Sequence, residues 1–133
     1  MDLSDDEFEI LYAILVSPSI SVNQLYRKLK GKVSKVRLLK LLGKLRSLGL
    51  IRAIRDPRHK QRIRLFLKED IQDLAKIFLT RTYIVTKEGI VEETDRLMKI
   101  YIRVASRVKD PLTLNFLKKL VLKEIDKLLC SIL

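Results

Sequence analysis

Residues 34–68 read SKVRLLKLLGKLRSLGLIRAIRDPRHKQRIRLFLK. The first half repeats leucine at helical spacing, and the second half consists of short segments in which Ile and Leu alternate with Arg. Ser34 is a suitable N-cap, and Gly49 is a suitable residue to end the helix. The stretch therefore predicts a helix from Lys35 to Gly49 that leads directly into a pair of strands.

The two predicted strands are residues 50–55 (LIRAIR) and residues 62–68 (RIRLFLK). In the second strand Ile63, Leu65 and Leu67 fall on one face, while Arg62, Arg64 and Lys68 face the other way. The turn between the strands, residues 56–61, contains Pro57. Residues 52–65 hold six Arg or Lys, one His and one acid. The pattern predicts a β-hairpin with a basic tip.

Two helices are predicted before this stretch. Ser4 followed by three acids indicates a capped helix over residues 4–16, which Ser17 and Pro18 end. Ser21 can cap a second helix over residues 21–30, with Gly31 as its stop. On the third helix, the leucines at helical spacing predict one buried stripe of Leu38, Leu41, Leu42, Leu45 and Leu48.

The remainder of the chain has helical periodicity. A helix is expected from Ile71 toward Lys87, with Gly89 as a break, and a second helix is expected to continue to Lys109. Asp110 followed by Pro111 predicts the start of a last helix. That helix has apolar residues on more than one face, so we expect it to pack on the domain or on a second chain.

The positive charge is concentrated in one part of the chain. The 133 residues carry a net charge of +12 and suit one domain with an added helical arm. Residues 21–68 hold sixteen Lys or Arg and a single acid, a net charge of +15, whereas residues 1–20 hold five acids and no Lys or Arg. A local field of this size favours a polyanionic partner.

Several function classes find no support in the sequence. The acidic first residues are unlike a signal peptide, and no long uncharged apolar run spans a membrane. A single cysteine, Cys130, fits a reducing cytoplasm and is expected to pack in the last helix. His59 has no ligand partner at metal spacing, Tyr83 and Tyr101 are expected in a core, and no catalytic motif or cofactor pattern is found. We expect no enzyme activity, no cofactor and no metal.

The predicted fold is mainly α with a small β-hairpin: a winged helix-turn-helix over residues 1–68, followed by a C-terminal helical dimerisation region over residues 69–133. The third helix can enter a major groove, and the hairpin can reach the minor groove or phosphates. Expected DNA contacts are Lys35, Val36, Arg37 and Lys40 to bases, Asn23, Arg27, Lys28 and Lys44 to phosphates, and Arg55, Arg58, His59, Lys60 and Arg62 from the hairpin. Asp56, the one acid there, can pair with a nearby Arg and fix its pose.

Residues 8–68 resemble the helix-turn-helix and wing of the MarR family of regulators. The resemblance lies in Leu45, Gly49, Leu50 and Ile51, followed by the Asp56-Pro57-Arg58 wing motif. It implies that Arg58 enters the minor groove and that Asp56 positions it. The wing is about one residue shorter than is usual in the family, and the chain begins almost at its first helix. Dimerisation would then rely on the C-terminal helices, as in small archaeal regulators with helical tails.

We therefore predict a homodimeric, cytoplasmic, nucleoid-associated regulator that binds double-stranded DNA. Two alternatives stay open on the sequence alone. Recognition helices often carry amide or hydroxyl side chains, and this one offers mainly Lys and Arg, which also suits an architectural protein that coats DNA without sequence preference. The third possibility is a protein-interaction module. A small-molecule effector has no support in any residue pattern.

Overall fold

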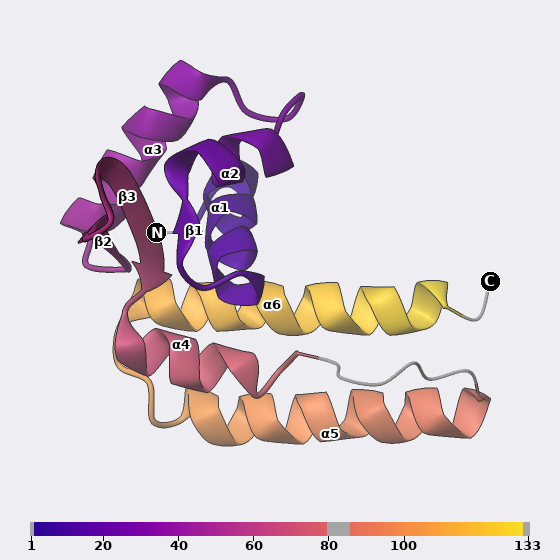
Figure 1. The fold of residues 1–133 in the computed structure, drawn as a ribbon. Coiled ribbons are helices and arrows are strands. Elements are labelled where there is room, and N and C mark those ends of the chain that lie inside the picture. Colours follow the sequence, from indigo (N-terminus) through magenta and orange to yellow (C-terminus); the bar gives the residue numbers. More distant parts are fainter. Residues whose placement is uncertain (1, 80–85, 132–133) are drawn as a thin grey trace. The chain divides into compact units, whose positions relative to one another are not determined.

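The computed structural model describes residues 2–79 and 86–131, with the side chain of Lys60 also left out (Figure 1). The described residues form six helices and three strands. They divide into two compact units, one of Leu3–Asp73 and one of Met1–Asp2 with Leu74–Leu133. Helix α4 (Glu69–Lys76) crosses this division.

The first unit follows the predicted order of three helices and two strands, with one further short strand between the first two helices. Its elements are α1 (Asp5–Val16), β1 (Ile20–Ser21), α2 (Val22–Lys28), α3 (Lys35–Ser47), β2 (Ile51–Asp56) and β3 (His59–Leu67). The three predicted N-caps are confirmed, because the side chains of Ser4, Ser21 and Ser34 each accept a hydrogen bond from a backbone N–H three residues on. Gly49 has φ 75°, the left-handed conformation that ends α3.

The sheet has a third strand that the sequence did not predict. Its order is β1-β3-β2, and both pairs are antiparallel. Strand β1 pairs Ile20 with Leu65, and β2 pairs Ile51 with Leu67. With only two residues, β1 is too short to show alternation in the sequence. It is placed by Ser19, which has φ 75° and donates its backbone N–H to the carbonyl of Leu65 at 3.0 Å.

The hairpin turn is tighter than predicted. We expected a turn over residues 56–61, whereas β3 already begins at His59 and pairs it with Asp56. The register shifts between Arg55 and Asp56, which lets the basic residues continue the strand up to the tip. The strand pair β2–β3, together with its two-residue turn, is called the wing below.

The core of this unit is formed by one side of each helix and of the sheet. On α3 the side chains of Leu38, Leu41, Leu42 and Leu45 are buried, as predicted, and α3 packs against β2. The prediction for Leu48 was wrong, because its side chain is 41 % exposed. Leu48 is the C-cap of α3, where the chain leaves the helix and the buried stripe ends.

The second unit contains α5 (Lys87–Ala105) and α6 (Pro111–Cys130), which lie antiparallel and in contact (Figure 1). The predicted start of α6 is confirmed: Asp110 caps it and Pro111 occupies the first turn. Leu97 on α5 and Leu117 and Leu120 on α6 are fully buried.

Three predictions for this unit were wrong. Helix α4 ends at Lys76 instead of extending toward Lys87. Gly89 does not break a helix: it lies in the first turn of α5 and donates its backbone N–H to the Thr86 cap at 3.0 Å. Cys130 is exposed at the end of α6 and does not pack in a core. Tyr83 lies outside the described residues, and Tyr101 is half-buried.

The first unit is a winged helix-turn-helix, because α2 and α3 form the helix-turn-helix and β2 and β3 form the wing that follows it. The protein is mainly helical with a small antiparallel sheet, as predicted. Among the described residues, no helix is both long enough and apolar enough to cross a membrane.

Candidate nucleic-acid interface

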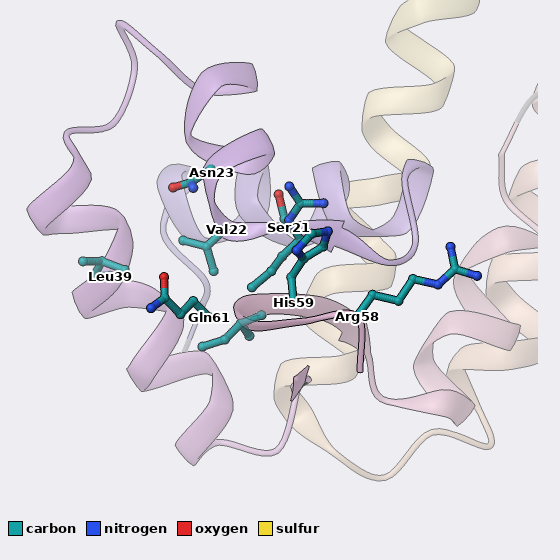
Figure 2. A pocket seen from close by; sticks show the side chains of 9 residues that line it. Ser21, Val22, Asn23, Leu39, Arg58, His59 and Gln61 are labelled. Atoms are coloured by element: carbon teal, nitrogen blue, oxygen red, sulfur yellow. The ribbon is translucent and has the colours of Figure 1, made fainter. Parts of the chain in front are cut away.

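A groove of about 700 Å³ lies where the start of α2, the middle of α3 and the wing meet (Figure 2). It is lined by Ser21, Val22, Asn23, Leu39, Arg58, His59, Gln61, Arg62 and Ile63. Two arginines and one histidine come from the wing, whereas the α2 and α3 side is neutral. The groove is open, and it joins the helix-turn-helix surface to the tip of the wing.

The tip of the wing is held by Asp56. One oxygen of its carboxylate accepts the backbone N–H of Arg58 at 2.9 Å, and the other is paired with the Arg64 guanidinium at 3.0 Å. Arg64 also donates to the carbonyl of Ser19 at 3.0 Å, so one network connects the turn, β3 and the chain before β1. Asp56 does pair with an arginine, but the partner is Arg64, and Arg58 is bonded through its backbone.

The Arg58 side chain takes no part in this network and is exposed at the tip of the wing. In Figure 2 its guanidinium extends from the tip of the wing on the side opposite Leu39. The backbone N–H of Arg58, and then the Arg64 guanidinium, lower the pKa of Asp56 below the usual range of an aspartate. Asp56 therefore stays ionised at neutral pH and keeps the turn in place.

Two of the basic residues predicted on α3 are paired with acids of α1. Arg37 Nε lies 2.7 Å from the Asp6 carboxylate, and Lys44 Nζ lies 3.1 Å from the Glu7 carboxylate. Arg37 and Lys44 are seven residues apart, so they share one face of α3. The acidic first turn of α1 thus contacts that face, and part of the +15 charge is balanced within the unit.

Glu7 is the best buried of these acids, at 3 % exposed. Burial alone would raise its pKa, but the backbone N–H of Ser4 at 2.8 Å and the Lys44 ammonium outweigh burial, so the pKa of Glu7 is lowered. A carboxyl group whose pKa is lower in the folded state stabilises the fold above its unfolded pKa of about 4.3. That contribution is lost as the pH falls through the folded pKa.

Glu7→Gln is therefore expected to reduce the acid sensitivity of the fold. The wild-type melting temperature should drop between about pH 6 and about pH 3, and the variant, which has no carboxyl group to protonate here, should show a smaller drop. Thermal unfolding followed by circular dichroism at both pH values measures the difference. Glu92→Gln, at an exposed position of α5, is the control and should leave the wild-type drop nearly unchanged. If the melting temperatures of Glu7→Gln and of the wild type fall equally, the lowered pKa of Glu7 does not contribute to the stability of the fold.

The remaining predicted contacts are distributed over three elements. Lys35 Nζ donates to the Asn23 side chain at 3.3 Å and lies 5.6 Å from the centre of the Tyr26 ring, which links the start of α3 to α2. Lys28 donates to the Ser17 hydroxyl at 3.0 Å, at the end of α1. Val36 and Lys40 are exposed on α3, Arg27 is exposed on α2, and Arg55 is exposed on β2. The side chain of Lys60 lies outside the described residues.

The structure brings together only some of the predicted residues. Among the described residues, Asn23, Arg58, His59 and Arg62 line the groove. The groove also contains residues that the sequence analysis did not select, namely Ser21, Val22, Leu39, Gln61 and Ile63. For Leu39 a signal was present, because it falls outside the spacing of the buried leucine stripe and had to be exposed.

The chemistry of this surface suits an extended anion. The groove offers the guanidinium groups of Arg58 and Arg62, the imidazole of His59 and the side-chain amides of Asn23 and Gln61. Among the described residues, no group of three or more His, Cys, Asp or Glu could hold a metal ion.

No family model matches the chain, and no curated protein matches it. Two similar solved structures are those of the PcaV transcriptional regulator from Streptomyces coelicolor, in complex with its natural ligand, and of the transcriptional regulator PA4135. PcaV is 13 % identical to this chain, with a TM-score of 0.46, and the matched region covers 98 % of this chain and 76 % of the PcaV chain. PA4135 is 18 % identical, with a TM-score of 0.48, and the matched region covers 94 % of this chain and 78 % of the PA4135 chain. With both TM-scores below 0.5, any functional conclusion has to come from the residues of this chain.

Proposed function

We propose that the protein is a sequence-specific, MarR-like DNA-binding transcriptional regulator. In this proposal α3 enters the major groove and the wing contacts the minor groove or the flanking phosphates. Residues 1–68 would bind DNA, and residues 69–133 would join two chains.

The observation that carries the proposal is the place of the positive charge within the fold. Residues 21–68 hold sixteen Lys or Arg and one acid, and they form the helix-turn-helix and the wing. The one acid, Asp56, is buried at the base of the turn and paired with Arg64. The surface from α2 to the wing tip is therefore free of exposed acids from its own segment. A protein-interaction module has no need of this segregation.

A salt titration of binding tests the proposal. The full chain is titrated by fluorescence anisotropy against the duplex from upstream of its own gene and against a scrambled duplex of equal length. We expect the native duplex to bind more tightly, with a preference that persists near about 0.2 M salt.

The other outcomes each favour an alternative. Equal affinity for both duplexes, with a steep loss as salt rises, would point to an architectural protein that lacks sequence preference. Absence of binding to either duplex at low salt would overturn the DNA-binding proposal and favour a protein-interaction module.

The second unit supports the proposal of a homodimer. On α5 the side chains of Val91, Met98 and Ile102 are 67 %, 51 % and 68 % exposed. These residues are seven and four apart, so they form one apolar stripe along the helix. Exposed apolar stripes of this kind mark association surfaces, and an unpaired copy would leave this one in water.

Ile102→Glu is expected to shift the protein from dimer to monomer, because it places a charge within the proposed apolar contact. Ile102 is exposed, so the fold of the single chain should be unaffected. Sedimentation velocity measures the molecular mass of each variant. Arg103→Glu, on the neighbouring exposed position, is the matched control and should remain dimeric. A wild-type chain that sediments as a monomer would contradict the dimer.

A further inference from the structure

One face of α3 is exposed and largely apolar, although the segment around it is strongly basic. Val36 is 80 % exposed and Leu39 is 51 % exposed. Lys40 and Gly43 complete this face, because residues at spacings of three, four and seven lie above one another on a helix. Leu39 also lines the groove between α3 and the wing, as Figure 2 shows.

The cations at the other predicted base-contact positions are already engaged. Arg37 is paired with Asp6 at 2.7 Å, and Lys35 is bonded to Asn23 at 3.3 Å. Among the described residues, Lys40 has no ion pair or hydrogen bond through its side chain. The groups on α3 that are free to meet a base edge are therefore mainly apolar.

Gly43 gives an independent indication of a close approach. A glycine inside an exposed helix destabilises it relative to alanine, and the fold does not require one here. Gly43 has no positive φ, and a Cβ added to it would have no heavy atom within 4 Å. Its missing side chain lets another molecule come close to the helix backbone at the same face.

We propose that this face reads DNA through the 5-methyl groups of thymine in the major groove. Val36 and Leu39 would contact methyl groups, which are the apolar feature that major-groove edges offer. Gly43 would let α3 approach the bases, and Lys40 would contact a phosphate. The occupant is DNA because the apolar face belongs to a segment with sixteen Lys or Arg and one acid, and Arg58 and Arg62 line the same groove as Leu39. The inference rests on the proposed function and adds the base feature that is read.

Uracil in place of thymine tests the inference, since it removes only the methyl group. The full wild-type chain first selects duplexes from a random-sequence pool, and the recovered duplex is made with thymine and with uracil. The wild type should bind the uracil duplex roughly fourfold more weakly for each methyl group contacted, by the transfer free energy of one such group. For Leu39→Ala this thymine preference should be smaller.

Two further variants complete the test. Lys40→Ala is the matched control on the same face, and it should weaken binding to both duplexes alike while keeping the wild-type thymine preference. Gly43→Ala should raise the melting temperature and yet lower DNA affinity, a combination that a purely structural role would not produce.

The failures of the two proposals are distinguishable. Equal binding of the wild type to thymine and uracil duplexes, a recovered sequence without thymine, or unchanged affinity of Gly43→Ala would overturn the methyl readout and leave DNA binding intact. If Leu39→Ala lowers the affinity for the thymine duplex and the uracil duplex equally, the methyl readout is also overturned. A wild type that binds none of the duplexes would overturn the proposed function as well.

Discussion

Leu38→Ala is expected to lower the free energy of unfolding by about 2–5 kcal/mol, the range for truncating a fully buried leucine. Leu38 is 0 % exposed and lies in the first half of α3, which packs against β2. The loss has two parts, the transfer free energy of the removed atoms and the cavity left in a small core. Because folded domains are stable by only about 5–15 kcal/mol, this one change removes a large part of that stability.

Leu39→Ala is the matched control, since it makes the same substitution one residue further on. Leu39 is 51 % exposed, so little apolar surface is lost from a buried environment, and the cost should be within about 0.5 kcal/mol. Urea unfolding of both variants, followed by circular dichroism, gives the two free energies. Equal costs for the two variants would contradict the orientation of α3, and with it the surface assigned to DNA.

The fold was predictable where local chemistry decides it. Ser4, Ser21 and Ser34 each combine a capping hydroxyl with a following helical pattern, and all three cap a helix. Asp110 caps α6 and Pro111 occupies its first turn, so the start of this helix is also decided by adjacent residues. The alternation in β3 predicted one face of Ile63, Leu65 and Leu67, of which Leu65 and Leu67 are buried, whereas Ile63, nearer the tip, is 38 % exposed.

The fold was not predictable where distant contacts decide it. Strand β1 exists because Ile20 and Ser21 pair with β3, more than forty residues later in the chain. The wing turn is short because Asp56 binds Arg64 and the backbone of Arg58, which carries β3 as far as His59. Neither contact leaves a periodic pattern in the sequence.

The individual contacts of the candidate site were less predictable than the segment that carries it. The density of Arg and Lys selects the segment that folds into the helix-turn-helix and the wing, because charge is visible without a structure. It does not tell which cations are free. The pairs of Arg37 with Asp6 and of Lys44 with Glu7 join residues about thirty positions or more apart, and only the fold brings them together. Because these cations are paired, exposed apolar residues such as Leu39 become stronger candidates for contact with DNA in the proposed function.

Arg58→Ala is expected to weaken DNA binding by about 1–3 kcal/mol, or roughly 5- to 150-fold. Its side chain extends from the tip of the wing, while its backbone N–H is held by Asp56 at 2.9 Å. Because the backbone of the turn is already ordered, binding does not have to fix it, and the narrow minor groove concentrates negative potential that attracts a guanidinium. Fluorescence anisotropy at constant salt, with the duplex selected by the wild type, measures the loss.

Arg52→Ala separates the contact from the general effect of charge, because it removes the same group from an exposed position of the same unit, four residues before Asp56 on β2. It lies about 13 Å along the strand from the tip and should change affinity little at about 0.15 M salt, where the Debye length is about 8 Å. Asp56→Ala should weaken binding as Arg58→Ala does, since it releases the turn but leaves the guanidinium in place. A variant without Arg58 that binds as tightly as the wild type would show that the wing does not contact DNA through this residue.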